Sequence, residues 1–62
     1  MTKPECELVG TDGNVFAIIA TVCKCLAVAG QGDRAEKFRK LAIGAKSYDE
    51  VLQLIFEYVD PY

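Results

Sequence analysis

Three cysteines carry the most distinctive chemistry in this chain: Cys6 near the start, and Cys23 and Cys25 inside the most apolar segment. Cys23 and Cys25 cannot bond to each other, because at about 100° per helical residue their side chains point about 200° apart. Zinc is not expected, since the sequence has no histidine and no Cys-x-x-Cys pair. With an odd number of cysteines, we expect free thiols in a reduced compartment.

These thiols do not indicate an enzyme. Burial on an apolar helix raises the pKa of a thiol and leaves little nucleophilic thiolate, which argues against Cys23 and Cys25. Cys6 lies nearer the chain end, and we expect it alone to react with a labelling reagent. No histidine is present to act as a base, and the one serine, Ser47, is better placed as a helix cap. The sequence therefore predicts no catalytic residue and no cofactor.

Asp12, Gly13 and Asn14 match the opening of a calcium-binding loop. The glutamate that such a loop needs at its twelfth position would fall on Cys23, so calcium binding is not expected. A glycine beside a helix start can also bind an anion through backbone N–H groups, but no lysine follows this one. We interpret Asp12 and Asn14 as helix caps and predict no metal.

Turn and cap residues divide the chain into three helices, predicted over about 14–29, 33–43 and 47–59. Asp33 and Ser47 are each followed three residues later by a glutamate, the spacing of a helix-capping pair. The short links make the helices neighbours, so we predict a mainly α three-helix bundle in one small domain, 1–62. Residues 1–7 are expected to be flexible, and the segments 7–9 and 58–59 are the candidates for a short β-ribbon.

Composition and charge limit the function. The chain has 62 residues, of which 52% are hydrophobic, and its formal net charge is −2. Such a chain folds with a modest core and has no general attraction to nucleic acid or anionic lipid. We expect no membrane association, because the apolar run 15–29 is shorter than the roughly 20 residues of a membrane span. The acidic residues after Lys3 do not fit an export signal, so we predict a cytoplasmic protein.

Helical periodicity gives each predicted helix an inward face. The first helix has the widest one, since its bulky residues cover about half of the circumference. The predicted core comprises Val15, Phe16, Ile18, Ile19, Val22, Cys23, Cys25 and Leu26, then Ala35, Phe38, Leu41 and Ala42, and finally Tyr48, Val51, Leu52, Leu54, Ile55, Phe56, Tyr58 and Val59.

Two outward surfaces are candidate partner sites. The first is a small-residue face that is either alanine-rich and solvated or a seam for a second chain. The second is a basic face that is either solvated or a docking patch for an acidic partner. The residues concerned are Ala17, Ala20 and Lys24 on the first helix and Lys37, Arg39 and Lys40 on the second.

One motif resembles a known group of proteins. The segment LVGTDGN at residues 8–14, with SYDEVL at 47–52 and the pair at 58–59, is similar to small uncharacterised bacterial proteins that phages and conjugative elements often encode. The similarity covers most of residues 8–59. In that group the first helix turns basic in its second half, whereas here Lys24 is the single cation of that stretch. The resemblance implies a mobile-element setting and no activity.

We therefore expect a non-enzymatic protein-interaction module, because the apolar faces of the first and third helices exceed what a core of this length needs. A homodimer is one way to cover the excess. The alternative is a nucleic-acid-associated regulator that uses Lys37, Arg39, Lys40 and Lys46. That alternative is weaker, since the third helix of a helix-turn-helix would present mostly acidic residues to the phosphates.

Overall fold

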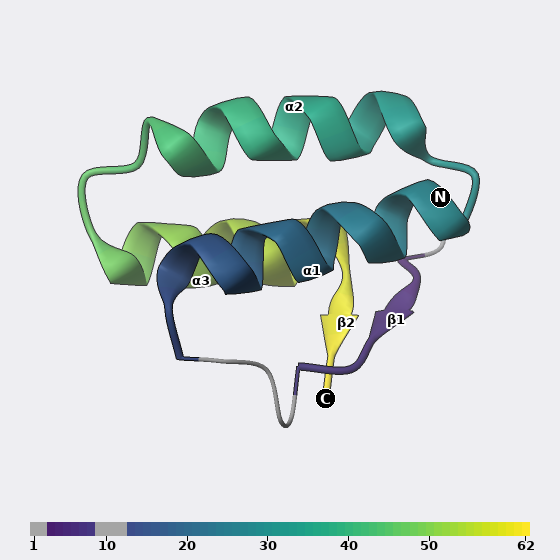
Figure 1. Ribbon diagram of the computed structural model, residues 1–62, viewed down its shortest axis with the longest axis horizontal. Coiled ribbons are helices and arrows are strands. Elements are labelled where there is room, and N and C mark those ends of the chain that lie inside the picture. Colours follow the sequence, from purple (N-terminus) through teal and green to yellow (C-terminus); the bar gives the residue numbers. More distant parts are fainter. Residues whose placement is uncertain (1–2, 9–12) are drawn as a thin grey trace.

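The computed structural model describes residues 3–8 and 13–62, which form three helices and two short strands. Their order is β1 (Glu5–Cys6), α1 (Val15–Val28), α2 (Gly32–Ile43), α3 (Tyr48–Tyr58) and β2 (Asp60–Pro61). In Figure 1, α1 and α3 run in the same direction, α2 runs back along the top, and both strands lie on the side away from α2. The predicted mainly helical fold, with a small sheet from the terminal segments, is confirmed.

Local signals fix both ends of α1. The side-chain oxygen of Asn14 accepts a hydrogen bond from the Phe16 N–H at 2.8 Å, so Asn14 caps the helix as predicted. After the helix, Gly30 adopts a φ of 79°, a conformation that favours glycine, and the chain reverses there. The other predicted cap, Asp12, lies outside the described residues.

The predicted cap of α2 is wrong. Gln31, not Asp33, occupies the cap position, and its carbonyl accepts the Ala35 N–H at 3.0 Å. The helix starts earlier than expected because the turn at Gly30 reverses the chain at once, which leaves Gly32 already helical. Asp33 lies in the first helical turn, where the helix dipole favours a carboxylate.

The predicted cap of α3 is confirmed. The Ser47 hydroxyl accepts a hydrogen bond from the Glu50 N–H at 3.3 Å. The Glu50 carboxylate in turn accepts the Lys46 N–H at 2.5 Å, one residue earlier than in the usual reciprocal pair. This double cap fixes the direction in which α3 leaves the short link after α2.

The core joins the three helices to the N-terminal strand. Phe38 of α2 lies at its centre with no exposed surface, and its ring packs edge-to-face with the Tyr58 ring, with the two ring centroids 5.4 Å apart. The buried residues are Cys6, Ile18, Ile19, Val22, Leu26, Ala35, Phe38, Ala42, Val51, Ile55, Tyr58 and Val59. Most of the predicted core residues are therefore buried, and Cys6 is an addition that the sequence did not indicate.

Four residues predicted for the core are exposed: Phe16, Leu41, Tyr48 and Phe56. On α3 the buried face is narrower than predicted and centres on Val51, Ile55 and Tyr58.

The two strands pair in parallel, with Glu5 opposite Asp60 and Cys6 opposite Pro61. The Asp60 N–H donates to the Pro4 carbonyl at 2.9 Å, and the Tyr62 N–H donates to the Cys6 carbonyl at 3.0 Å. The sheet thus lies nearer both chain ends than the predicted segments 7–9 and 58–59. Flexibility was predicted for residues 1–7, but the structure places Glu5–Cys6 in a strand. Within the described ranges, no helix is long and apolar enough to cross a membrane.

Candidate functional site

A cleft of about 230 Å³ opens at the end of the bundle where α1 starts, α2 ends and α3 starts. This end is on the left of Figure 1. Buried Ile19, Ala42 and Val51 are among the residues that line it, and it is bordered by three large exposed side chains. These are Phe16 at 67%, Ile43 at 55% and Tyr48 at 48%. We call this depression the end cleft.

The local sequence explains why these side chains converge. Phe16 and Tyr48 lie just inside the capped starts of α1 and α3, and Ile43 is the last residue of α2. Because α2 runs opposite to α1 and α3 and the link 44–47 is short, these three helix ends meet. The exposed apolar groups are therefore fixed by capped helices rather than carried on a long loop.

The apolar surface continues between α1 and α2. A second depression shares Phe16, Ile19 and Ile43 with the end cleft and extends past Ala20 to Cys23 and Arg39. Two of the six predicted partner residues, Ala20 and Arg39, thus lie on one continuous surface with Phe16.

The other predicted partner residues lie elsewhere. Lys24 borders a separate hollow beside Cys25 and Val28. Ala17 is half-buried, and its carbonyl accepts the Thr21 hydroxyl hydrogen bond at 2.9 Å. Lys37 and Lys40 are exposed on α2. The six predicted residues therefore do not form one site.

A third depression adjoins the end cleft. It is acidic, whereas Lys46 is the one charged residue, among those that the structure describes, that borders the end cleft. It lies between the end of α2 and the outer side of α3, and it is lined by Leu41, Gly44, Ala45, Glu50, Gln53, Leu54 and Glu57. We call it the acidic hollow. Ala45 lines both depressions, while Lys46 borders the end cleft alone. A basic and an acidic apolar surface therefore meet at Ala45.

Sequence reasoning missed the residues that make the end cleft. Phe16 and Tyr48 were assigned to the core because helical periodicity alone does not show how much of a face its neighbours cover. Ile43 did offer a signal, since it is a large apolar residue outside the inward face of its helix and directly before Gly44.

The cysteines also differ from the prediction. Cys6 and Cys25 form a disulfide, with their Cα atoms 5.8 Å apart, and Cys23 is the free cysteine. The expectation of free thiols holds for Cys23 and is wrong for Cys6 and Cys25. The expectation that Cys6 is the reactive thiol is also wrong, because Cys6 is bonded and only 1% exposed. Helical spacing excludes only the Cys23–Cys25 pair, and no local sequence signal shows that a strand brings Cys6 to α1.

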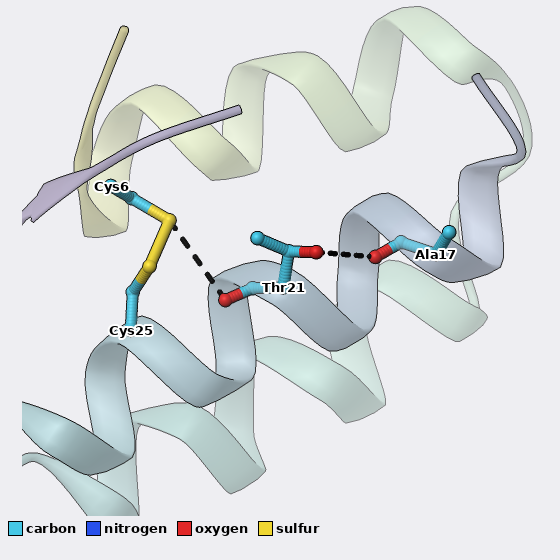
Figure 2. The surroundings of a disulfide bond; sticks show 4 residues. All are labelled: Cys6, Ala17, Thr21 and Cys25. Atoms are coloured by element: carbon cyan, nitrogen blue, oxygen red, sulfur yellow. Dashed lines mark hydrogen bonds between the residues drawn. A yellow bond between two sulfur atoms is a disulfide. The ribbon is translucent and has the colours of Figure 1, made fainter. Parts of the chain in front are cut away.

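Figure 2 shows how the disulfide joins β1 to α1. The Cys6 sulfur lies 3.8 Å from the Thr21 carbonyl oxygen, one turn before Cys25. Cys23 faces α2 instead, and its thiol donates to the Ala35 carbonyl at 3.6 Å. Burial raises the pKa of the Cys23 thiol above its ordinary value, and the positive charge of Arg39 partly opposes this.

The described residues hold no group of histidine, cysteine or acidic side chains that could bind a metal ion. The geometry instead offers two adjoining apolar surfaces of opposite charge and one disulfide clamp. In the comparisons with known proteins, no family model, curated protein or solved structure matches this chain.

Proposed function

We propose that the protein is a non-enzymatic interaction module that forms a homodimer through the end cleft and the acidic hollow. The observation that supports this is the pair of adjoining apolar depressions that share Ala45 and carry opposite charges. Exposed apolar side chains that cluster in this way mark protein-binding surfaces more often than scattered ones do.

A second copy of the chain offers each depression an apolar surface of the opposite charge. A two-fold axis near Ala45 places the end cleft of one protomer over the acidic hollow of its partner, and the same contact forms twice. Lys46 then faces Glu50 and Glu57 of the other copy, while Phe16 and Ile43 cover Leu41 and Leu54. Opposite charges on facing surfaces fix the register of such an interface and speed its formation.

The size of the chain supports the same proposal. A domain of 62 residues buries a smaller fraction of its surface than a larger one and often needs a disulfide or a partner subunit. This chain has one disulfide, yet large apolar side chains stay exposed at the end cleft. Dimerisation would bury them.

Sedimentation equilibrium of Ile43→Glu tests the proposal. We expect the dissociation constant of the dimer to rise at least about tenfold, which corresponds to about 1.4 kcal/mol. Phe56→Glu is the matched control, because Phe56 is 60% exposed but lines neither depression. A wild-type protein that stays monomeric up to hundreds of micromolar contradicts the homodimer.

A charge exchange tests the arrangement of the two surfaces. Lys46→Glu should weaken the dimer, because it places a carboxylate opposite the acidic hollow. Adding Glu57→Lys to that variant should restore much of the affinity. If the double variant binds more weakly than either single variant, the two depressions do not face each other.

The cellular setting is also a proposal. The resemblance of residues 8–14 and 47–52 supports a gene on a phage or conjugative element, and the sequence favours the cytoplasm. The Cys6–Cys25 disulfide is more typical of oxidising compartments. Trapping the thiols of cells with acid and an alkylating reagent measures the redox state directly, and a fully oxidised pool counts against a cytoplasmic protein.

A further inference from the structure

The Cys6–Cys25 disulfide is the covalent link between the terminal sheet and α1. We propose that Cys25 is a site of thiol–disulfide exchange and that the exchange releases β1 from the helices. The reacting partner is a low-molecular-weight thiol or a dithiol reductant. This inference is independent of the homodimer, because its atoms lie outside the end cleft and the acidic hollow.

The two cysteines of the disulfide differ in their exposure. Cys25 is half-buried and lines an open hollow of about 290 Å³, together with Pro4, Glu5, Lys24, Val28 and Ala29. Cys6, the second residue of β1, is buried with 1% exposure. An attacking thiolate therefore approaches Cys25 from this hollow, where the charged residues Glu5 and Lys24 have opposite signs.

The exchange has a defined electron balance. The thiolate forms a bond to the Cys25 sulfur, the bond between Cys25 and Cys6 breaks, and Cys6 leaves as a thiolate that takes a proton from water. With a dithiol, the second thiol attacks the mixed disulfide and releases Cys25. The reductant becomes a disulfide, and the protein gains two electrons and two protons.

The surroundings of Cys6, the leaving group, already contain a hydrogen-bond acceptor for a thiol. The Thr21 carbonyl oxygen lies 3.8 Å from the Cys6 sulfur, so a Cys6 thiol finds a hydrogen-bond acceptor at once. Cys23 cannot replace the external thiol, because it lies on the α2 side of α1 and donates to the Ala35 carbonyl.

The two strands are too short to stay paired and packed on the helices once the disulfide is broken. Each strand has two residues, and the backbone bonds that join them involve the amides of Leu8, Asp60 and Tyr62. Strand pairs of this length are not independently stable in water. Once the covalent link is lost, β1 leaves α1 and takes the buried Cys6 side chain out of the core.

Peptide mapping tests the direction of attack. The Cys23→Ala variant, oxidised, is treated briefly with reduced glutathione, and free thiols are then blocked with N-ethylmaleimide. Trypsin cleavage after Lys24 separates the peptides that carry Cys6 and Cys25. We expect glutathione on Cys25 and the maleimide on Cys6. Glutathione mainly on Cys6, or no adduct at all, overturns the proposal.

Amide hydrogen exchange tests the release of the strand. On reduction with dithiothreitol, the Leu8, Asp60 and Tyr62 amides should exchange at least about tenfold faster, while Val22 and Ile55 amides stay within about twofold. A Cys6→Ser, Cys25→Ser double variant should match the reduced protein with or without the reductant. Equal protection of the three sheet amides in the oxidised and reduced proteins contradicts a clamp.

Discussion

Apolar side chains are buried on the sheet side of the molecule, whereas apolar side chains of similar size are exposed at the end cleft. On the sheet side, the segments β1 and β2 cover α1 and α3, and Cys6 and Val59 are fully or almost fully buried. The Lys3 ammonium group adds a hydrogen bond to the Phe56 carbonyl at 2.7 Å on the same side. At the end cleft, Phe16, Ile43 and Tyr48 lie at helix ends and stay exposed.

The difference shows that the terminal segments, and not helix hydrophobicity, decide which surface is closed. Helices α1 and α3 have more apolar circumference than α2 alone can cover. The chain ends close one part of that surface and secure it with a disulfide. The part that they do not reach is the surface that we assign to a second copy.

The same substitution at a buried and at an exposed phenylalanine should have very different effects on stability. Phe38→Ala should lower the free energy of unfolding by about 3–5 kcal/mol, because it empties a fully buried site. Phe16→Ala should cost less than about 1 kcal/mol in the dilute monomer, since its side chain is 67% exposed. Urea unfolding at low protein concentration measures both, and equal losses would mean that Phe16 belongs to the core.

Removing the disulfide tests how the sheet side is secured. The bond closes a loop with a sequence separation of 19, so its loss through Cys6→Ala with Cys25→Ala should destabilise the protein by about 3 kcal/mol. The control is Cys23→Ala, which removes only a half-buried thiol and should cost about 1 kcal/mol or less. Urea unfolding without reductant compares them. A double variant as stable as the control is incompatible with a structural role for the bond.

Substitutions at Ser47 and Asp33 compare a residue that caps its helix with one that does not. Ser47→Ala should destabilise the protein by about 1 kcal/mol, because the Glu50 N–H loses its acceptor. Asp33→Ala should cost only a few tenths of a kcal/mol, since Asp33 sits in the first turn of α2 without capping it. Thermal unfolding of both variants measures the difference. A larger loss for Asp33→Ala would restore the cap that the sequence predicted.

The smallest effect concerns Cys23, which borders the surface between α1 and α2. In the oxidised protein its pKa is raised by burial, so alkylation by iodoacetamide should reach half of its maximal rate at a higher pH than for an ordinary thiol. Arg39→Gln should move that midpoint further upward, because the positive charge that favours the thiolate is removed. A downward shift would show that Arg39 does not act on this thiol.

The sequence predicts the helices because their signals are local. Asn14 and Ser47 cap α1 and α3 as expected, and helical spacing places Ile18, Val22 and Ile55 in the core. Contacts between residues far apart in the sequence are harder to predict. The pairing of Cys6 with Cys25 depends on a parallel sheet between the two chain ends, and no short motif reports such a contact.

The candidate site was harder to predict for the same reason. Whether Phe16 or Tyr48 is covered depends on how three helix ends converge, which periodicity within one helix does not reveal. Ala20 and Arg39 were identified from the sequence, but as parts of two separate faces rather than of one surface between α1 and α2.

We assign self-association to the end cleft and the acidic hollow, and we expect the closed sheet side to take no part in it. A dilution series of amide NMR spectra from about 1 mM to about 10 µM tests it residue by residue. We predict concentration-dependent shifts for the amides of Phe16, Ile43, Ala45 and Tyr48, with those of Cys6 and Tyr62 unchanged. Spectra that do not change with concentration, or shifts confined to the sheet side, would contradict the account.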